Sequence, residues 1–399
     1  MNNKLIITKN NGIIYSAFLD KEQQLTELYP ESEEKNSLVG NIYIGKVSNI
    51  AKGINAVFVD IGIEKDVFLQ LEDGDHIQYI NDKESKLPPK IGDELLVQII
   101  RDSYGSKAPA ATGMISLAGR YSVLTFKKSF VGLSSKITLP SERKRLKRIF
   151  TPYINEDYGF IIRTNAENLE EEVLISEITM LIDNYNNIMS TYRYKKLFQI
   201  LYKALPDYLR IIRDLYKSEI SSCEFDDYDI FSKATKYFKD NSDCPINYDF
   251  VFVEEGEGSL FKKYNFKSKL EKLLNEKIWL KSGANLVIQP TEALVSIDVN
   301  TSKSIGKSNF EDTIFAINIE AAKEIARQLR LRNLSGIIIV DFIDMGSETN
   351  KKLLLETLKN EISKDRIKTT LIDMTPLGLV ELTRKKTDNT LSEKLKNII

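Results

Sequence analysis

Histidine and cysteine are scarce in this chain of 399 residues, which contains one histidine, His76, and two cysteines, Cys223 and Cys244. So few ligands exclude a four-ligand zinc site built from one chain. They also exclude serine–histidine and cysteine–histidine catalysis, unless His76 itself lies in a site. Two ordinary thiols are expected, because disulfides do not persist in a reducing compartment. If the chain is an enzyme, carboxylates and a metal are its expected tools.

Long apolar runs and a large net charge are also missing. No segment approaches the roughly twenty apolar residues of a membrane helix, and the N-terminal MNNKLIITKNNG lacks the apolar core of a signal peptide. A cytoplasmic chain that is not inserted in a membrane is therefore expected. Its 56 Lys and Arg balance 57 Asp and Glu, so a polyanionic partner would need local basic patches. The length predicts about two to four domains.

Short alternating strands fill the N-terminal third. Residues 4–31 alternate apolar and polar side chains around NNG, which predicts a β-hairpin. Residues 39–119 add about five short strands separated by glycine and asparagine turns, which predicts a small barrel of the oligonucleotide-binding (OB) type. Phe58 and Phe68 lie on these strands and either stack unpaired bases or belong to the core. Lys107, in GSKAPA, could contact a nucleic-acid backbone.

The C-terminal third alternates strands and helices. Residues 284–300 predict a hairpin, 311–333 a helix with acidic residues at its start and arginine at its end, and 335–344 a buried strand. An amphipathic helix is expected over 266–280, just before this region. The sequence thus predicts an α/β arrangement for its last part.

Acids mark the ends of two of these strands. In LVSIDVN, Asp298 and Asn300 share one face with Ser296, because strand side chains alternate. Asp341 ends the strand IIIVD. Two carboxylates and an amide on neighbouring strand ends form a hard oxygen site suited to Mg²⁺ and a phosphate, although solvated acids would give the same pattern.

Four further polar positions are weaker candidates. Asp344 is expected to be a turn or helix-cap residue rather than a ligand. Glu292 is either an ordinary turn carboxylate or a group that orients water. Arg163 and Thr164 end the strand FIIRT, where a guanidinium and a hydroxyl could clamp a phosphate.

Longer motifs resemble one known family. TEALVSIDVN followed by EDTIFAINIEAAKEIARQLRLRNLSGIIIVDFIDM closely resembles the central signature of the ribonuclease E/G family. GNIYIGKVSNIAKGINAVFVDIG with FLQLED resembles the S1-type domain of that family, and SLAGRYSVL and LGLVELTRKK also fit. The motifs follow the family's order from near residue 38 to about 386, so the resemblance covers nearly the whole chain.

The resemblance implies a multidomain fold of the α+β and α/β classes. An RNase H-like subdomain would be interrupted by an S1-type OB-fold barrel and a 5′-sensor subdomain, and a deoxyribonuclease-I-like α/β subdomain would follow. The implied boundaries are 1–37 and 207–272 for the two parts of the RNase H-like subdomain, 38–118 for the S1-type domain, 119–206 for the 5′-sensor and 273–399 for the catalytic subdomain.

The resemblance also implies site residues. Asp298 and Asp341 match the family's two magnesium-ligand aspartates, and Asn300 matches the asparagine that supports the reacting phosphate. Phe58, Phe68 and Lys107 match family residues that bind RNA. Arg163 and Thr164 match the pair that recognises a 5′-monophosphate, with Gly119 and Val123 at supporting positions. Lys368 is the nearest equivalent of a family arginine. It keeps the charge without the bidentate fork, so a weaker 5′-end preference is expected.

The implied activity is an Mg²⁺-dependent endoribonuclease. It would cut single-stranded, A/U-rich RNA to 5′-phosphate and 3′-hydroxyl products, in rRNA and tRNA processing and mRNA decay. Family members usually continue into a Cys-Pro-x-Cys zinc link between two chains and a small dimerisation domain. This sequence ends at Ile399 without them, so no zinc is expected and a homodimer would need another surface. The alternatives are a non-catalytic RNA-binding translation or ribosome-assembly factor, and a DNA nuclease.

Overall fold

The structure, a computed structural model, describes residues 3–33, 37–71, 77–80, 87–103, 107–215, 220–240, 248–301 and 310–398. Contacts within the chain divide it into two compact units. Unit 1 comprises Met1–Glu34, Ser222–Tyr228 and Phe250–Ile399, and unit 2 comprises Lys35–Ser221 and Asp229–Asp249.

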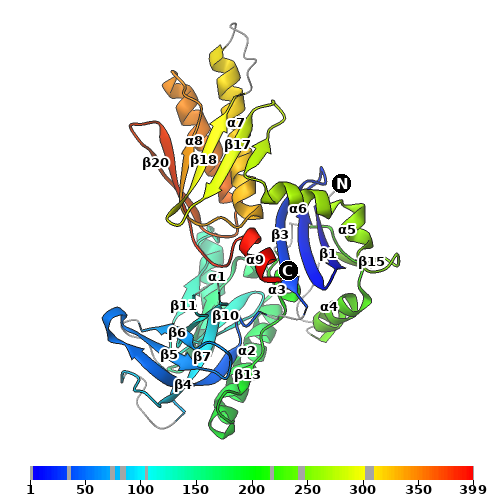
Figure 1. Cartoon of the computed structure of the whole chain (residues 1–399). Helices are drawn as coiled ribbons and strands as arrows, with labels where there is room; N and C mark the ends of the chain where they lie inside the picture. Colours follow the sequence, from blue (N-terminus) through cyan, green and yellow to red (C-terminus); the bar gives the residue numbers. More distant parts are fainter. Residues whose placement is uncertain are drawn as a thin grey trace. The chain divides into compact units, whose positions relative to one another are not determined.

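Unit 2 contains a closed five-stranded barrel (Figure 1). Its strands follow the order β4-β5-β6-β8-β7, and β7 pairs back with β4 to close the ring. Gly45 lets β4 and the neighbouring β5 approach closely, because a Cβ there would collide with Val59 and Ile61. A further strand, β13, extends the sheet beside β4. The strands are β4 (Ile42–Ala51), β5 (Ala56–Asp60), β6 (Val67–Gln70), β7 (Glu94–Arg101), β8 (Ala110–Thr112) and β13 (Ile200–Tyr202).

A second layer of unit 2 combines a four-stranded sheet, in the order β11-β12-β10-β9, with two helices, α1 and α2. Their apolar faces share one core with residues of the barrel strands. The elements are β9 (Ser116–Ala118), β10 (Ser122–Phe126), β11 (Val131–Leu133), β12 (Tyr158–Ile162), α1 (Pro140–Phe150) and α2 (Glu171–Thr191). The remaining helical segments are η1 (Lys52–Ile54), η2 (Thr151–Tyr153), η3 (Thr164–Ala166), η4 (Tyr192–Tyr194), α3 (Asp207–Asp214) and α4 (Tyr228–Asp240).

The first sheet of unit 1 has the order β15-β14-β1-β2-β3. Asn11 and Gly12 connect β1 to β2, and both have positive φ angles (52° and 72°), as a tight hairpin turn requires. Strand β14 pairs with β1 in parallel. The elements are β1 (Lys4–Asn10), β2 (Ile13–Leu19), β3 (Leu25–Ser32), β14 (Ser222–Phe225) and β15 (Asp249–Phe252), with α5 (Ser259–Lys263), α6 (Phe266–Leu274) and α9 (Leu391–Ile398) in the same core.

The second sheet of unit 1 has the order β16-β17-β18-β19-β21-β20. Only β18 and β19 are parallel, and α7 connects them in the chain. Helices α7 and α8 pack on one face, where residues such as Ile338 and Val340 are fully buried. Each such side chain contributes about 1.5–3 kcal/mol by leaving water. The elements are β16 (Lys277–Trp279), β17 (Asn285–Pro290), β18 (Leu294–Asn300), α7 (Phe310–Leu331), β19 (Gly336–Asp341), α8 (Glu348–Ser363), β20 (Thr369–Met374) and β21 (Leu379–Arg384).

The sequence predictions of a multidomain α+β fold, an OB-like barrel and the two hairpins are confirmed. Two local predictions are wrong. The helix expected over 266–280 ends at Leu274, because the following residues pair with β17 as strand β16. The strand expected to be buried is covered on one face only, since Ile337 is 52% exposed. Among the described residues, no helix has both the length and the apolar character needed to cross a membrane.

Candidate active site

Two carboxylates meet at the carboxyl ends of β18 and β19. The strands run parallel, and their register places Asp298 directly opposite Asp341. Parallel strands joined by a crossover helix end at the same edge of a sheet, which is where open α/β sheets place their ligands. The pairing expected from the two sequence patterns is therefore present.

Both acids lie on the face of the sheet opposite α7 and α8. Along β18, Val295, Ile297 and Val299 are buried in the helix-covered core, while Asp298 is exposed. Asp341 is likewise exposed at the end of β19. Strand alternation thus turns the apolar residues toward the helices and both carboxylates toward the open face.

The electrostatics of this pair favour a cation. Partial burial, followed by the charges of Asp298 and Asp344, raises the pKa of Asp341. Asn300 donates a hydrogen bond from Nδ2 to Oδ2 of Asp298, at 2.6 Å. The carboxylates of Asp298 and Asp341 therefore repel each other, and the Asn300 amide, which bonds to one of them, is neutral. A cation between the two carboxylates would relieve this repulsion.

The donor set fits Mg²⁺. This ion commonly uses one or two protein carboxylates and keeps several waters or phosphate oxygens for the rest of its shell. The oxygens of Asp298 and Asp341 satisfy that requirement, with the amide oxygen of Asn300 nearby on the same face. Within the described part of the chain, no cluster of three or more His, Cys, Asp or Glu residues could hold a metal. A site with fewer protein ligands, completed by water and phosphate, is the one these residues can form.

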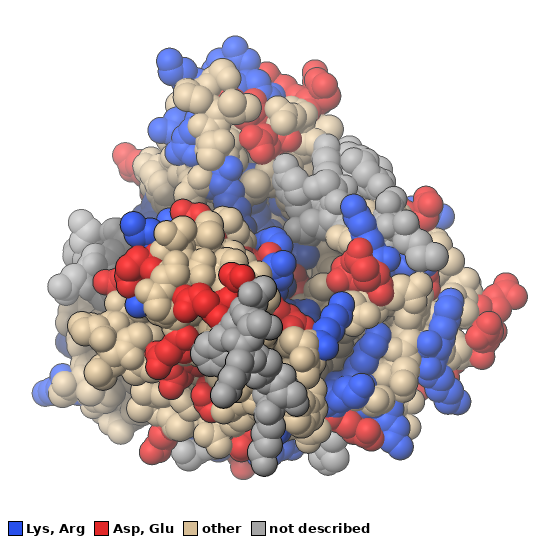
Figure 2. All heavy atoms as spheres, turned by 90° about the horizontal axis from the view of Figure 1, so that it is seen from above, with Lys and Arg blue, Asp and Glu red and all other residues tan. Residues whose placement is uncertain are grey.

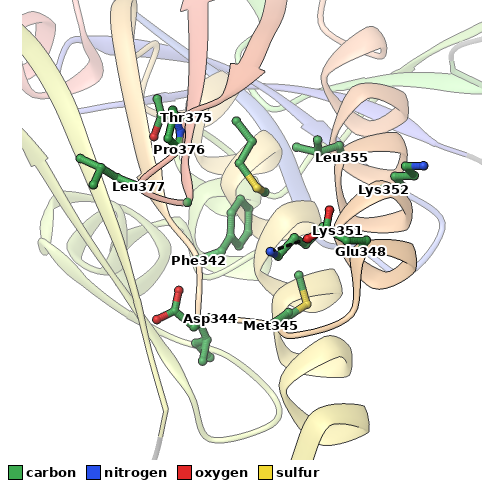
Figure 3. A pocket seen from close by; sticks show the side chains of 13 residues that line it. Phe342, Asp344, Met345, Glu348, Lys351, Lys352, Leu355, Thr375, Pro376 and Leu377 are labelled. Atoms are coloured by element: carbon green, nitrogen blue, oxygen red, sulfur yellow. Dashed lines mark hydrogen bonds and ion pairs between the residues drawn. The ribbon is translucent and has the colours of Figure 1, made fainter.

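Asp344 lies in the loop between β19 and α8. The cap of α8 is Ser347, whose side chain accepts a hydrogen bond from Asn350 N, so of the two roles expected for Asp344, turn residue or helix cap, the helix cap is wrong. Asp344 instead lines a pocket of about 470 Å³ together with Phe342, Lys351 and the β20–β21 turn (Figure 3). Neither Asp298 nor Asp341 is among the residues that line this pocket.

Glu292 lies in the turn between β17 and β18. It is six positions before Asp298 along an extended segment, a span of ~20 Å. Orienting a water at the carboxylate pair is therefore ruled out for Glu292, and its reading as an ordinary turn carboxylate holds.

The barrel brings two of its three predicted RNA-contacting residues together. Phe58 on β5 and Phe68 on β6 are cross-strand partners, with ring centroids 5.9 Å apart and an interplanar angle of 67°. Both rings are half-buried. Lys107 is exposed, between β7 and β8. The aromatic pair therefore belongs partly to the barrel wall and presents ring edges and faces to the surface.

Arg163 is held by an acid that the sequence reading did not identify. Its Nη1 and Nη2 donate to the two carboxylate oxygens of Asp214 (2.6 and 3.0 Å), and Nη1 also donates to Gly119 O (2.8 Å). Arg213 contacts the same carboxylate from Nε at 2.8 Å. Although burial opposes ionisation, the two guanidinium groups lower the pKa of Asp214. Two cations sharing one anion leave a net positive charge, which suits a phosphate.

A buried carboxylate shapes the adjoining turn. Glu177 on α2 accepts backbone N–H groups of Arg120, Tyr121 and Ser122, at 2.5–3.0 Å. A Cβ on Gly119 would lie 2.5 Å from this carboxyl carbon, so only glycine fits there. Burial raises the pKa of Glu177 despite these hydrogen bonds.

The other predicted phosphate residues are distributed as follows. Thr164 pairs with Ser134 through their hydroxyl groups (2.9 Å), and Val123 is half-buried on β10. Lys368 is exposed in unit 1, just before β20, whereas Arg163 belongs to unit 2. The face drawn in Figure 2 carries both basic and acidic side chains.

Comparison with known proteins gives consistent matches. Residues 116–387 match the model of the ribonuclease E/G family. Ribonuclease G of Salmonella typhimurium (strain SL1344) is 37% identical over 386 residues, which cover 94% of this chain and 78% of the relative. Ribonuclease G of Escherichia coli (strain K12) is 36% identical over 385 residues, with the same coverage.

The chain belongs to the ribonuclease E/G family. The predicted family and the predicted enzyme class, endoribonuclease, are confirmed. Ribonuclease E of Nostoc sp. (strain PCC 7120 / SAG 25.82 / UTEX 2576) is 31% identical over 398 residues, which cover 98% of this chain and 57% of that protein.

Sequence reasoning missed Glu177 and Asp214. Glu177 had a signal, because it occupies a position in the apolar stripe of α2, between Leu174 and Ile178. Asp214 had none, since its partner Arg163 is 51 positions away. The two cysteines and the histidine of this ribonuclease E/G family chain give no evidence of a role in the site. Cys223 is a buried free thiol whose pKa is raised by burial, and His76 and Cys244 lie outside the described residues.

Proposed function

We propose that this chain hydrolyses single-stranded, A/U-rich RNA in an Mg²⁺-dependent reaction, leaving 5′-phosphate and 3′-hydroxyl ends. The observation that carries the proposal is the pairing of Asp298 with Asp341 on the open face of a sheet, in a member of a ribonuclease family. An RNA-binding factor without catalysis would not need two adjacent carboxylates whose charges repel each other.

Asp298 and Asp341 would hold the metal ion, and the Asn300 amide would support the reacting phosphate. Bound Mg²⁺ supplies a Lewis acid that favours ionisation of water and neutralises charge on a phosphoryl oxygen. The hydrogen bond from Asn300 fixes the Asp298 carboxylate on the open face, so the acid is oriented before substrate arrives. In the bound state the Asn300 amide is free to turn toward the phosphate.

The barrel would select unpaired RNA. Phe58 and Phe68 can stack bases only if those bases are splayed out of a duplex, and Lys107 would neutralise the backbone. Their cross-strand packing limits the motion of both rings, which reduces the entropy lost on binding.

Arg163 and Thr164 would bind a 5′-monophosphate, with Gly119 and Val123 in support. Asp214 and Arg213 fix the guanidinium, and the cluster keeps one net positive charge for the phosphate. Lys368 would add a point charge without a bidentate fork, so the 5′-end preference is expected to be modest.

The domain plan is part of the same proposal. We assign residues 38–118 to an S1-type domain, 119–206 to a 5′-sensor, 1–37 and 207–272 to an RNase H-like subdomain and 273–399 to a deoxyribonuclease-I-like catalytic subdomain. RNA precursors and mRNA would be the partners, in the cytoplasm. A homodimer stays a prediction.

Cleavage of a fluorescent, 5′-monophosphorylated A/U-rich RNA tests the proposal. We expect cleavage with Mg²⁺, none with EDTA, and none in Asp298→Asn. Glu292→Gln is the matched control, because it neutralises an exposed acid at the far end of the same strand and should cut normally. RNA binding without cleavage in Mg²⁺ would favour the non-catalytic alternative, and cleavage by Asp298→Asn at the normal rate would reject the assigned site.

A further inference from the structure

The edge strand β16 carries a lysine and the single tryptophan of the chain, Lys277 and Trp279, on either side of Ile278. Ile278 packs against the core that α7 and α8 cover. Because strand side chains alternate, Lys277 and Trp279 lie on the opposite face of the sheet. This is the open face that carries Asp298 and Asp341.

Strand pairing aligns these two side chains with the candidate active site. Through one residue of β17 in each case, Lys277 is aligned with Asp298, and Trp279 with Asn300. Neighbouring strands lie about 4.8 Å apart, so β16 and β18, which are separated by β17, are about 10 Å apart. Successive nucleotides of a stacked strand rise about 3.4 Å, so about three stacked nucleotides, or fewer extended ones, cover this distance.

The indole ring of Trp279 is available to a ligand. Trp279 is 65% exposed, and Nζ of Lys277 lies 4.4 Å from its ring centroid. Since Lys277 contacts one face of the ring, the high exposure requires the other face and the ring edge to be open to solvent. An open aromatic face can stack a base, while an ammonium group with three N–H donors can neutralise a phosphate.

Protection of the sheet edge explains Lys277 alone. A lysine on an edge strand discourages pairing with other sheets. An exposed tryptophan on the same strand has the opposite effect, because it adds apolar surface to that edge. Trp279 also lies on the face away from the helix-covered core, so its ring adds nothing to the packing of that core. A ligand that covers the ring accounts for both residues.

We propose that Trp279 and Lys277 form a stacking platform for single-stranded RNA, which holds the base of a nucleotide within about three positions of the scissile phosphate. The assignment rests on the proposed function, which locates that phosphate at Asp298 and Asp341, and deepens it by adding a base contact on the same sheet face. Every base has a π-face, so the platform contributes affinity and positioning without sequence preference. Paired bases cannot reach the ring, so it also favours unpaired RNA.

Tryptophan emission tests the stacking itself, because Trp279 is the only tryptophan in the sequence. In EDTA, where no cleavage is expected, 5′-hydroxyl A/U-rich RNA should quench the emission of the wild type as it binds. An abasic strand of the same length should not, since it offers phosphates without bases. Binding is followed separately by filter retention. Unchanged emission at RNA concentrations that saturate retention, or equal quenching by the abasic strand, overturns the platform.

Cleavage rates test where the stacked base lies. On 5′-hydroxyl RNA with one cleavage site, Trp279→Ala should lower kcat/KM about tenfold, the size of one base stacked on an aromatic ring. Trp279→Phe keeps a ring and should recover much of the loss. In the wild type, removal of the base at one position near the cleavage site should cost a similar factor. In Trp279→Ala, removal of that base should cost nothing more.

Salt dependence tests the part of Lys277. Lys277→Ala should flatten the slope of log kcat/KM against log salt by about 0.7, the value for one phosphate contact of a single strand. Leu353→Ala and Lys359→Ala are the matched controls, because they remove an exposed leucine and an exposed lysine from α8, which covers the other face of the sheet. Both should keep the wild-type rate, salt slope and abasic profile.

The outcomes separate the platform from the proposed function. A wild-type rate in Trp279→Ala, or the full abasic penalty at every position in that variant, overturns the platform. An unchanged salt slope in Lys277→Ala overturns the phosphate contact. Failure of the proposed function looks different: the wild type would not cut intact RNA in Mg²⁺, whereas quenching in EDTA would still report a base on Trp279.

Discussion

Two pairs of parallel strands in unit 1 carry acids, and they use them in opposite ways. On β18 and β19, Asp298 faces Asp341 on an open sheet face, with Asn300 as the bound donor. Beside β1, Glu224 on β14 is buried and accepts from Lys4 and from Tyr264 OH, at 2.5 and 2.9 Å. The comparison shows that the partners of an acid, rather than its place on a parallel strand, determine whether it is free to bind a ligand.

Asp226, just after β14, reinforces the contrast. It is 2% exposed and accepts from Thr8 Oγ1 (2.6 Å), Lys9 N (3.2 Å) and Leu260 N (3.0 Å). These donors saturate the carboxylate and tie β1, β14 and α5 together. Glu224 and Asp226 therefore stabilise the fold. Asp298 and Asp341, between β18 and β19, instead leave carboxylate oxygens available for a metal ion.

The largest effect expected from the comparison is in Asp341→Asn. Because Asp341 is exposed and repelled by its neighbours, the free energy of unfolding should not fall, while kcat/KM should drop by about a thousandfold, the loss of several kcal/mol of charge stabilisation. Cleavage rates and urea unfolding measured on the same preparation test this. A variant that loses activity only in proportion to its folded fraction would break the contrast.

The opposite result is expected for Asp226→Ala. Two buried donors and one half-buried donor would lose their acceptor, which costs about 3 kcal/mol in the free energy of unfolding. The cleavage rate per folded molecule should stay at the wild-type value. Glu255→Ala, an exposed acid of the same unit, is the control for urea unfolding. Unchanged stability would show that Asp226 is no structural acid.

Asp214, in unit 2, is an intermediate case, since it is ion-paired with two arginines that are proposed to serve a phosphate. Asp214→Asn should lower the ratio of cleavage rates for 5′-monophosphate over 5′-hydroxyl RNA by roughly tenfold, because Arg163 loses its bidentate support. Cleavage of the 5′-hydroxyl RNA is the internal control and should not change. An equal loss on both RNAs would mean that Asp214 supports only the fold.

The smallest expected effect is on how the free energy of unfolding depends on pH, and it compares Glu224 with Asp341. Lys4 and Tyr264 lower the pKa of Glu224 below 4.5 despite its burial, so its stabilisation is full above pH 4.5 and is lost as pH falls through the folded-state pKa. The pKa of Asp341 is raised above 3.8, so its ionised form costs stability above that pKa and the cost disappears in acid.

Unfolding free energies of Glu224→Gln and Asp341→Asn between pH 3 and 7 should therefore differ from wild type with opposite signs. Glu224→Gln should be less stable at neutral pH and converge with wild type in acid. Asp341→Asn should be slightly more stable at neutral pH and also converge. The same sign for both variants would contradict the assignment of one acid as structural and the other as a ligand.

The sequence predicted what depends on local pattern. Alternation in LVSIDVN placed Asp298 and Asn300 on one face, and the apolar run before Asp341 placed that acid at a strand end. The turn residues Asn11 and Gly12 predicted the first hairpin. The helix that ends at Leu274 was predicted too long, because pairing of β16 with β17 outweighs helical periodicity.

Long-range partners could not be predicted in this way. Nothing in SCEFDD marks Glu224 and Asp226 as structural acids, since Lys4 and Thr8, which donate to them, are more than 200 positions away. Asp344 resembled a helix cap because the sequence does not show that Ser347 fills that role. Only the folded structure shows which carboxylates are fully hydrogen-bonded by distant residues.

The crossover through α7 has a consequence for synthesis of the protein. Asp298 and Asp341 become neighbours only when β19 has emerged from the ribosome and has paired with β18, with the whole of α7 made between them. A growing chain that stops before β19 holds one carboxylate alone and lacks the pair. If this pair cuts RNA, as proposed, a nascent chain gains its nuclease site only after Asp341 has been made.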